Sequence, residues 1–389
     1  MSSFERLENN REDNNLIKVL HILSSLDGGG VESLLYSYYK NMDRNQFRFD
    51  FAIFDTKVGK MEDLFVKLGS RIYRLPPKRN GLHKSLDTLN QVIKSGSYDI
   101  VHSHQNMNAI FAMYIAKKNH VNVRIAHSHY GNIPHAQLLE KQSIRFFLRP
   151  ILKSLATEWF ACSKSAAVAL WGKKDSSKVT ILYNAIDLES FAYDSKTRME
   201  VRRRLGIENK VVLGCVARLN AQKNLIFLLK VFSTLAKNNE NICLVIVGDG
   251  DQREEIEDYI YQYKLNNSVI LLGNRNDVAD IIKGFDMFVL PSAFEGLGIV
   301  YIESQAAGIP TLASDKVPLD TKITDLITYL PINDPSIWVN YIQNKLYSVS
   351  NEYSGDKLRY IEQVRAAHYD IVCESKRLEQ LYTEYMKGV

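Results

Sequence analysis

The sequence lacks any long apolar run, which argues against a protein that crosses a membrane. No segment reaches the ~18–20 apolar residues that a membrane-spanning helix requires. The polar N-terminal segment also lacks the apolar core of a secretory signal, so we expect residues 1–15 to form a disordered tail. We therefore expect a cytoplasmic protein that is at most peripheral at the inner face of the cell membrane.

Cysteine is scarce, and the excess of positive charge is small. The four cysteines are Cys162, Cys215, Cys243 and Cys373. None has the spacing of metal ligands and three lie in apolar runs, which predicts buried thiols in a reducing compartment. A net charge of +5 suits anionic ligands or a membrane surface. No basic and aromatic motif indicates a nucleic-acid partner.

The chain is long enough for two domains, each with its own core. Apolar segments such as Lys18–Leu26 and Phe47–Phe54 alternate with helical patterns such as Val31–Asn41. Continuous apolar strands separated by helices are typical of parallel sheets that are covered on both faces. The predicted fold class is α/β, with two doubly wound Rossmann-like domains that face each other across a cleft.

The polar segment Glu189–Asn209, which contains three consecutive arginines, is interpreted as a linker with a short helix. We expect an N-terminal domain over 16–190 and a C-terminal domain over 191–365. A last helix over 366–389 is expected to pack back on the N-terminal domain. In doubly wound sheets, ligands bind beyond the carboxyl ends of the strands.

The most informative segment follows the predicted strand Met287–Leu290 and reads P-S-A-F-E-G-L-G before a helix that starts at Ile299. A glycine turn that leads into a helix gathers backbone N–H groups at the positive helix end, where a diphosphate can bind. Glu295 and Glu303 flank this cradle and can accept hydrogen bonds from sugar hydroxyls. The alternative is that Glu295 and Glu303 are exposed surface residues without a ligand role. The segment predicts a nucleotide-sugar site.

Further polar groups follow other strands of the second domain. Arg218 and Lys223 lie at the end of the strand Val211–Leu219, where two cations can hold a diphosphate or can remain solvated. Gly248 and Asn274 also close strands, and contacts with a base or ribose there are about as plausible as a plain loop role.

Gly28, Gly29 and Gly30 follow the first strand and precede a helix, so they form either an anion-binding turn or a plain tight turn. Ser33 occupies the position of the last glycine in a dinucleotide fingerprint, which weakens a dehydrogenase interpretation.

Two His-Ser-His triplets end predicted strands of the first domain, at His102 and His104 and at His127 and His129. Two imidazoles on one strand face can share a zinc ion, but no further ligand has convincing spacing. We therefore expect no metal, and instead a neutral imidazole that hydrogen-bonds a sugar hydroxyl.

The segment 136–155 combines apolar residues with Lys141, Arg145, Arg149 and Lys153 at four-residue spacing. Such a helix binds an anionic membrane surface, or it is a core helix with a solvated basic face.

From Lys18 to Ser314 the chain resembles the retaining glycosyltransferases of family 4, which have the GT-B fold. The resemblance rests on G-C-V-A-R-L-x3-K, I-V-G-D-G and P-S-x2-E-G-L-G-x4-E-x3-A-G-I-P, supported by D-I-V-H-S-H and I-L-Y-N-A-I-D. The chain looks most like members that build bacterial capsular, exopolysaccharide or O-antigen chains on lipid carriers. Asn224, Ala185 and Gln305 depart from the family pattern.

The resemblance implies a role for each matching residue. Arg218 and Lys223 would hold the donor diphosphate, Glu303 the ribose and Glu295 the sugar hydroxyls. His127 would face the sugar near its anomeric carbon, with Glu295, Arg218 and Lys223 as the other catalytic residues. The remaining donor contacts would come from Gly29, Gly30, Gly248, Asn274, Gly296, Leu297, Gly298, Ile299 and Val300. Gly28, Gly29, His104 and His129 would line the acceptor side.

The implied reaction is metal-independent hexosyl transfer with retention, from a nucleotide diphosphate sugar to a hydroxyl acceptor. UDP is the favoured nucleotide, and a lipid-linked saccharide is the expected acceptor. No cofactor is expected. The alternatives are a nucleotide-sugar epimerase of the same fold and a non-catalytic glycosyltransferase-like partner.

Overall fold

The computed structural model describes residues 16–77, 81–129, 138–352 and 357–388. The chain divides into two compact units, Met1–Ala185 with Ile371–Val389, and Ile186–Asp370. We call them the N-terminal and C-terminal domains. The division lies a few residues from the boundaries expected at 190 and 365, and the expected tail over 1–15 lies outside the described residues.

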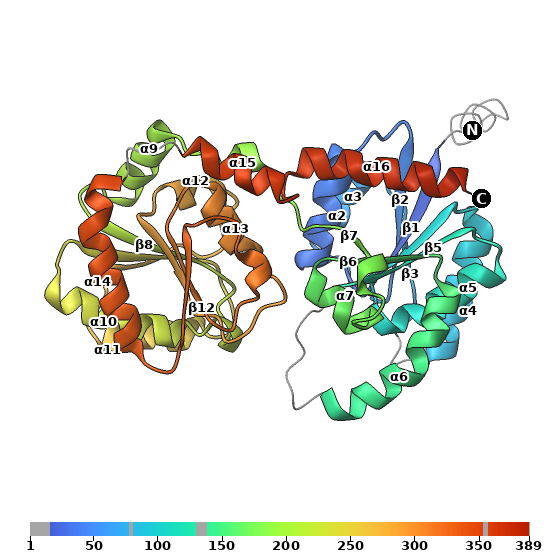
Figure 1. Ribbon diagram of the computed structural model, residues 1–389, viewed down its shortest axis with the longest axis horizontal. Helices are drawn as coiled ribbons and strands as arrows, with labels where there is room; N and C mark the ends of the chain where they lie inside the picture. The colour runs from blue at the N-terminus through green and yellow to red at the C-terminus, as the bar shows by residue number, and fades with distance from the viewer. Residues whose placement is uncertain (1–15, 78–80, 130–137, 353–356, 389) are drawn as a thin grey trace. The chain divides into compact units, whose positions relative to one another are not determined.

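The N-terminal domain is built on a parallel sheet of seven strands in the order β3-β2-β1-β4-β5-β6-β7 (Figure 1). The strands are β1 Ile17–Leu23, β2 Phe47–Ile53, β3 Ile72–Arg74, β4 Ile100–Ser103, β5 Val123–Ser128, β6 Glu158–Ala161 and β7 Thr180–Ile181. The helices are α2 Gly30–Asn41, α3 Glu62–Lys67, α4 Leu82–Gly96, α5 Ala109–Lys118, α6 Leu138–Leu155, α7 Lys164–Trp171 and α16 Ile371–Lys387. Short 3₁₀ turns cover Asn106–Asn108 and Ser176–Lys178.

Each face of this sheet has its own core, because side chains alternate along a strand. On β1, Leu20 and Ile22 pack into a core that is shared with α4, α5 and α7. Val19 and Leu23 pack into the opposite core, which contains residues of α2 and α16. The last helix of the chain, α16, runs beside α2 and completes that core (Figure 1).

The C-terminal domain has a parallel six-stranded sheet in the order β10-β9-β8-β11-β12-β13 (Figure 1). The strands are β8 Val211–Val216, β9 Ile242–Val247, β10 Val269–Leu271, β11 Met287–Leu290, β12 Thr311–Ser314 and β13 Ile327–Leu330. The helices are α8 Leu188–Phe191, α9 Ser195–Leu205, α10 Leu225–Asn238, α11 Arg253–Gln262, α12 Val278–Lys283, α13 Ile299–Ala306, α14 Pro335–Glu352 and α15 Leu358–Ala366. Short 3₁₀ turns cover Ala221–Lys223 and Leu319–Thr321.

In both sheets the first strand lies between the second and the fourth, so the strand order reverses direction there. This is the doubly wound arrangement, and it confirms the predicted fold class for each domain. The edge at the carboxyl ends of β1 and β4, or of β8 and β11, is the place where such a sheet binds ligands.

The segment 189–209, expected to be a linker with a short helix, contains α9 and most of α8 and belongs to the C-terminal domain. Arg198 and Arg202, one helical turn apart on α9, both pair with Asp286, which precedes β11. The same carboxylate accepts a bond from the Val212 N–H on β8 at 2.7 Å. Arg198 and Arg202 thus clamp α9 to the sheet through Asp286, while Arg203 and Arg204 remain exposed. The strand β13 was not predicted either. Its four residues, Ile327–Leu330, are too few to show a clear strand pattern.

Cys162, Cys215 and Cys243 are buried, as predicted, whereas Cys373 is exposed on α16. Among the described residues, none of the helices is long and apolar enough to cross a membrane.

Candidate functional site

The loop between β11 and α13 is held in a defined shape by buried hydroxyl groups. Tyr301 on α13 donates to the Leu290 carbonyl at 3.0 Å and reaches the Ser292 hydroxyl at 3.2 Å. Ser314 at the end of β12 donates to the Ser292 carbonyl at 2.6 Å. The segment that carries Glu295 is therefore fixed to two strands and one helix.

Gly298 ends this loop in a conformation that only glycine adopts easily, with φ at +84°. A Cβ atom there would lie 2.7 Å from the Tyr301 ring. Gly298 is also the N-cap of α13, and no side chain caps the helix. The first N–H groups of α13, with the positive helix end, are thus available to an anion beside the Glu295 loop.

Glu295 is 5% exposed and accepts three bonds, all from donors of its own domain. The Lys223 Nζ lies 2.5 Å from Oε1, Ser292 Oγ donates to the same oxygen at 2.7 Å, and Gln222 Nε2 donates to Oε2 at 3.2 Å. From the sequence, Lys223 was expected to bind the donor diphosphate and Glu295 the sugar hydroxyls. The structure brings the two side chains together as an ion pair.

Arg218 and Glu303 are less constrained. Arg218 is exposed just after β8, and in the described part of the chain its side chain has no hydrogen bond or ion pair. Glu303 on α13 is partly exposed, and its carboxylate likewise has no partner among the described residues. Burial raises the pKa of Glu303 to about 7. A carboxylate in this state gains from hydroxyl donors that a ligand brings.

The glycines after β9 serve a close approach of two chain segments. Gly248 has φ at +130°, and a Cβ there would lie 1.9 Å from the Ala217 carbonyl oxygen. The Gly248 N–H donates to Gly273 O at 2.8 Å, which joins this loop to the loop after β10. Gly248 therefore has a structural role by itself, while Asn274 is exposed beside Gly273.

The loop after β9 also contains an Asp-x-Asp triplet, Asp249-Gly250-Asp251, which was not among the predicted site residues. Asp249 Oδ1 accepts from the Gly250 N–H at 2.8 Å, and Oδ2 lies 3.6 Å from Arg253.

The glycine turn after β1 is partly filled by its own helix. Gly28 has φ at +92°, and Gly29 is the N-cap of α2. A Cβ on Gly29 would lie 2.6 Å from a carboxylate oxygen of Glu32. Burial raises the pKa of Glu32, while hydrogen bonds from backbone groups including Gly29 act in the opposite direction. An anion at this turn would have to displace that carboxylate.

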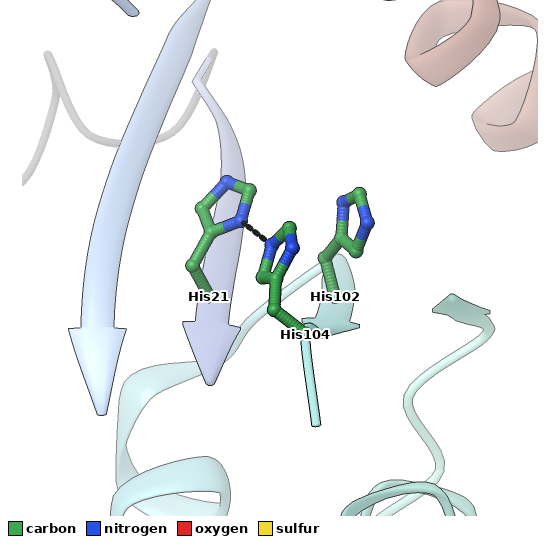
Figure 2. A group of neighbouring side chains, drawn as sticks. All are labelled: His21, His102 and His104. Atoms are coloured by element: carbon green, nitrogen blue, oxygen red, sulfur yellow. Dashed lines mark hydrogen bonds between the residues drawn. The ribbon is translucent and has the colours of Figure 1, made fainter. Parts of the chain in front are cut away.

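Five histidines of the N-terminal domain form one cluster, which we call the imidazole array: His21, His102, His104, His127 and His129. Sequence reasoning missed His21. The signal was available, because a doubly wound sheet places the first strand beside the fourth, and His21 is in register with His102. Figure 2 shows His21 and His104 joined by a hydrogen bond, with His102 beside them.

Two chains of hydrogen bonds run through the array. In one, His21 Nδ1 bonds His104 Nε2 at 2.9 Å, and His104 Nδ1 bonds His129 Nε2 at 2.9 Å. In the other, the Tyr382 hydroxyl bonds His102 Nδ1 at 2.8 Å, and His102 Nε2 bonds His127 Nδ1 at 3.1 Å. His21 Nε2 and His127 Nε2 are buried without a partner in the described structure.

All five imidazoles are expected to be neutral. Burial lowers the pKa of His21 and of His129 to about 3. Burial, with the neighbouring histidines as smaller contributions, also holds the pKa of His102, His104 and His127 well below its ordinary value.

The array contains two groups of three histidines whose ring nitrogens lie within 4.8 Å of one another. Sequence spacing indicated no third ligand for either His-Ser-His triplet, whereas the fold brings further imidazoles close to both. The rings are nonetheless stacked in pairs, His102 on His104 at 4.3 Å and His127 on His129 at 4.1 Å. Lone pairs lie in the ring planes, so stacked rings do not aim their nitrogens at the common point, about 2.0–2.1 Å away, that zinc requires.

The two candidates for the sugar-facing imidazole differ in exposure. His127 is completely buried, whereas His129, two residues further and just beyond β5, is partly exposed. His104 is also buried, and its backbone N–H donates to the Ile22 carbonyl oxygen.

The described half of α6 does not present the expected basic face. Arg149 Nε donates to the Leu170 carbonyl at 2.8 Å, and Lys153 Nζ lies 2.5 Å from Asp175 Oδ2. Phe147 and Ile151 are exposed instead, at 71% and 48%. The side chains of Lys141 and Arg145 lie outside the described part.

Comparisons with known proteins agree with this architecture. The family model described as Glycosyltransferase Family 4 matches residues 28–190, and the model described as Glycosyl transferases group 1 matches residues 197–330. EpsF of Bacillus subtilis (strain 168), named as a glycosyltransferase, is 31% identical over 335 residues, which cover 84% of this chain and 86% of EpsF. An α-1,3-galactosyltransferase of Escherichia coli is 27% identical and covers 77% of this chain and 79% of its own length.

Solved structures show the same fold. Anabaena HepE superimposes with a TM-score of 0.77 and 18% identity, covering 94% of this chain and all of HepE. WaaG superimposes with a TM-score of 0.66 and 15% identity, with 94% and 100% coverage. With the two doubly wound domains and the extended similarity to EpsF, the chain belongs to the family 4 glycosyltransferases of the GT-B fold, with a group 1 glycosyltransferase domain as its C-terminal half.

Proposed function

We propose that this glycosyltransferase moves a hexose from a nucleotide diphosphate sugar to a hydroxyl acceptor with retention of the anomeric configuration. The observation that carries the proposal is the buried Lys223–Glu295 pair beside the uncapped start of α13. An ammonium, a fixed carboxylate and free helix N–H groups within one domain match a diphosphate that is joined to a sugar rich in hydroxyls.

Charge develops on the diphosphate as the glycosidic bond breaks. Lys223 and the start of α13 oppose that charge without needing to reorganise, and the exposed Arg218 adds a second cation. The carboxylate of Glu295 already holds three donors, which disfavours its use as a nucleophile or a general acid. We therefore favour substitution on a single face of the sugar, with the leaving phosphate taking the proton of the acceptor hydroxyl.

We also propose that the transfer requires no metal, since the cations Lys223 and Arg218 perform the charge stabilisation. Asp249 and Asp251 carry the carboxylates that would hold a divalent cation if the proposal were wrong.

The relatives suggest the substrate class. The Escherichia coli relative is named for transfer from UDP-Gal to an α-D-GlcNAc-diphosphoundecaprenol acceptor, and CapH of Staphylococcus aureus for capsular polysaccharide biosynthesis. HepE has been solved with UDP and with UDP-glucose. We propose a UDP-sugar donor and a lipid-linked saccharide acceptor in capsule or exopolysaccharide synthesis.

A lipid-linked acceptor also places the enzyme at the cytoplasmic face of a membrane. We propose contact through α6, where Phe147 and Ile151 are exposed, and through Tyr114 on the adjoining α5, which is 60% exposed. Apolar side chains on a helix surface insert at the boundary of headgroups and acyl chains. The proposed contact is more apolar than the sequence suggested.

The test is a panel of nucleotide sugars screened by thermal shift, followed by turnover. We expect one UDP-sugar to raise the melting temperature, because a ligand that binds only the folded state stabilises it. That sugar should be transferred to a lipid-linked saccharide equally well with and without EDTA. An altered sugar still joined to its nucleotide would identify an epimerase. Binding without turnover on any acceptor would identify a non-catalytic partner.

A further inference from the structure

Tyr382 is a fully buried tyrosine on α16 whose hydroxyl faces the imidazole array. The one hydrogen-bond partner of this hydroxyl among the described residues is His102 Nδ1, at 2.8 Å. Burial raises the pKa of Tyr382 well above its usual range, so the hydroxyl keeps its proton. A buried hydroxyl with a single ring-nitrogen partner donates to it, since the opposite arrangement leaves the hydroxyl hydrogen without an acceptor.

The Tyr382 hydroxyl, at the end of this series of hydrogen bonds, determines which ring nitrogen of His102 and of His127 carries the proton. His102 accepts at Nδ1 and is neutral, so its own proton is on Nε2. His102 Nε2 therefore donates across 3.1 Å to His127 Nδ1. His127 accepts at Nδ1 and must carry its proton on Nε2. The other series of hydrogen bonds, from His21 to His129, has no hydroxyl among the described residues at its end that would fix its direction in the same way.

His127 Nε2 is thus an N–H donor, buried and without an acceptor among the described residues. A buried donor without an acceptor costs about 1–3 kcal/mol, so such a group in a folded protein calls for an acceptor oxygen beyond those of the described residues. His127 is the last residue but one of β5, near the carboxyl edge where this sheet type binds ligands.

We propose that Tyr382 sets the tautomer of His127 through His102, so that His127 meets the substrate only as a hydrogen-bond donor. Tyr382 and His102 are positioning residues in this scheme. The identity of the substrate, a nucleotide sugar, rests on the proposed function. The acceptor oxygen is a sugar hydroxyl or a bound water, and the experiment below separates the two.

The chemical consequence is that His127 cannot act as a general base. Its Nδ1 lone pair is used by His102, and Nε2 already carries a proton. His127 can stabilise charge or hold a hydroxyl in place, but the proton of the acceptor must go elsewhere. This agrees with a mechanism in which the leaving phosphate takes that proton.

The test is nitrogen NMR of the full-length enzyme labelled with ¹⁵N-histidine, in which each neutral tautomer has a distinct pair of ring shifts. We expect His127, assigned by comparison with His127→Gln, to carry its proton on Nε2. Tyr382→Phe keeps the aromatic ring and removes only the donor, so the His127 signals should move toward the other tautomer. Tyr385→Phe on the same helix is the matched control and should leave them unchanged.

Two further measurements connect the tautomer to the substrate. Adding the UDP-sugar found in the panel should shift the His127 Nε2 resonance, whereas an unchanged resonance would mean that the partner is water and would overturn the substrate contact. In Tyr382→Phe we expect kcat/KM to fall about two- to tenfold, a change typical of one lost hydrogen bond, with melting behaviour near that of Tyr385→Phe.

The proposal is overturned if His127 of the native enzyme carries its proton on Nδ1 or is charged. It is also overturned if Tyr382→Phe leaves the tautomer or the kinetics unchanged, or if elemental analysis finds a stoichiometric metal whose loss accompanies His102→Gln. The tautomer is measured without turnover. Failure of the proposed sugar transfer is therefore distinguishable from failure of this inference.

Discussion

At the scale of single residues, the two cations after β8 differ in what holds them. Lys223 is paired with the buried carboxylate of Glu295, so part of its charge is already offset. Arg218 is exposed and has no such partner in the described structure. The negative charge of a departing nucleotide would therefore be met mainly by Arg218, and Lys223 has a structural role in addition.

This difference predicts that the two alanine variants separate activity from stability. Arg218→Ala should lower kcat/KM about 100-fold, the size of effect seen when one preorganised donor is removed, and leave the melting temperature unchanged. Lys223→Ala should lower activity and also cost about 3 kcal/mol in the free energy of unfolding, because Glu295 is left buried without its cation. Initial rates and urea denaturation measure the two effects.

Arg203→Ala, on the exposed side of α9, is the control and should change neither quantity. Adding Glu295→Gln to Lys223→Ala should recover part of the lost stability but none of the activity. An Arg218→Ala enzyme with native activity would contradict the assignment of Arg218 to the diphosphate.

Some of the candidate site could be predicted from the sequence because its residues share one short segment. Glu295, Gly298 and Glu303 lie within nine positions of one another, and the strand, turn and helix around them can be inferred from apolar spacing. The pairing of Lys223 with Glu295 could not be predicted, since it joins residues 72 positions apart through the shape of two loops. The choice between His127 and His129 also depends on burial, which the repeated His-Ser-His pattern does not encode.

At the scale of elements, the helix α9 shows why a charged run was misread. Three consecutive arginines are typical of a solvated segment, and only the position of Asp286, more than eighty residues away, makes Arg198 and Arg202 a buried clamp. The apolar strands were predictable because they are buried on both faces. A polar helix that packs through ion pairs gives no such pattern.

We predict that Asp286→Ala destabilises the C-terminal domain by about 3–5 kcal/mol, because two buried guanidinium groups lose their counter-charge. Asp277→Ala is a suitable control. Asp277 pairs with Arg275 and Arg204 near the surface, where such pairs contribute less than about 1 kcal/mol. Thermal and urea unfolding followed by circular dichroism would measure both. Equal effects of the two variants would show that α9 is not clamped.

The imidazole array, which spans β1, β4 and β5, predicts that the N-terminal domain is sensitive to acid. Histidines of the unfolded chain titrate near 6.5, while burial lowers the pKa of His21 and of His129 to about 3 and that of the other three well below normal. Below pH 6.5 the unfolded chain therefore binds protons that the folded chain does not, and stability falls as the pH falls toward the folded values.

At pH 5.5 each histidine that stays neutral in the folded chain costs roughly 1 kcal/mol, so the five together cost a large share of the stability of a domain. Urea denaturation at several pH values should show this loss, and His21→Leu should make the pH dependence shallower by one proton. His83→Gln, at an exposed position, should leave the slope unchanged. A stability that does not vary between pH 7 and 5.5 would mean that the array is not neutral and buried.

At the scale of the whole molecule, the N-terminal domain is made from two separated parts of the chain. Its core contains Ile371, Leu378 and Tyr382 of α16 beside residues of β1 and β2. The C-terminal domain is a single uninterrupted segment between those parts.

We predict that residues 1–185 alone do not form a stable domain. Without α16, the core that contains Phe49 and Tyr38 would be exposed. The hydrogen bond from the Asp43 backbone N–H to the Glu379 carboxylate would also be lost. The same residues joined to 371–389 through a flexible linker should fold, and so should residues 186–370 by themselves. Dispersion of amide signals in two-dimensional NMR spectra tests all three. A well-folded 1–185 fragment would contradict the prediction.

The position of α16 also determines when the protein can fold during its synthesis. Domains usually fold in the order in which they leave the ribosome, with the N-terminal one first. Here the residues of α16 that close the N-terminal core are translated after the C-terminal domain, so that domain can be complete while the earlier-made sheet still lacks α16. A nascent chain that stops before Ile371 would carry an open apolar sheet face, which marks an unfinished product for chaperones and proteases.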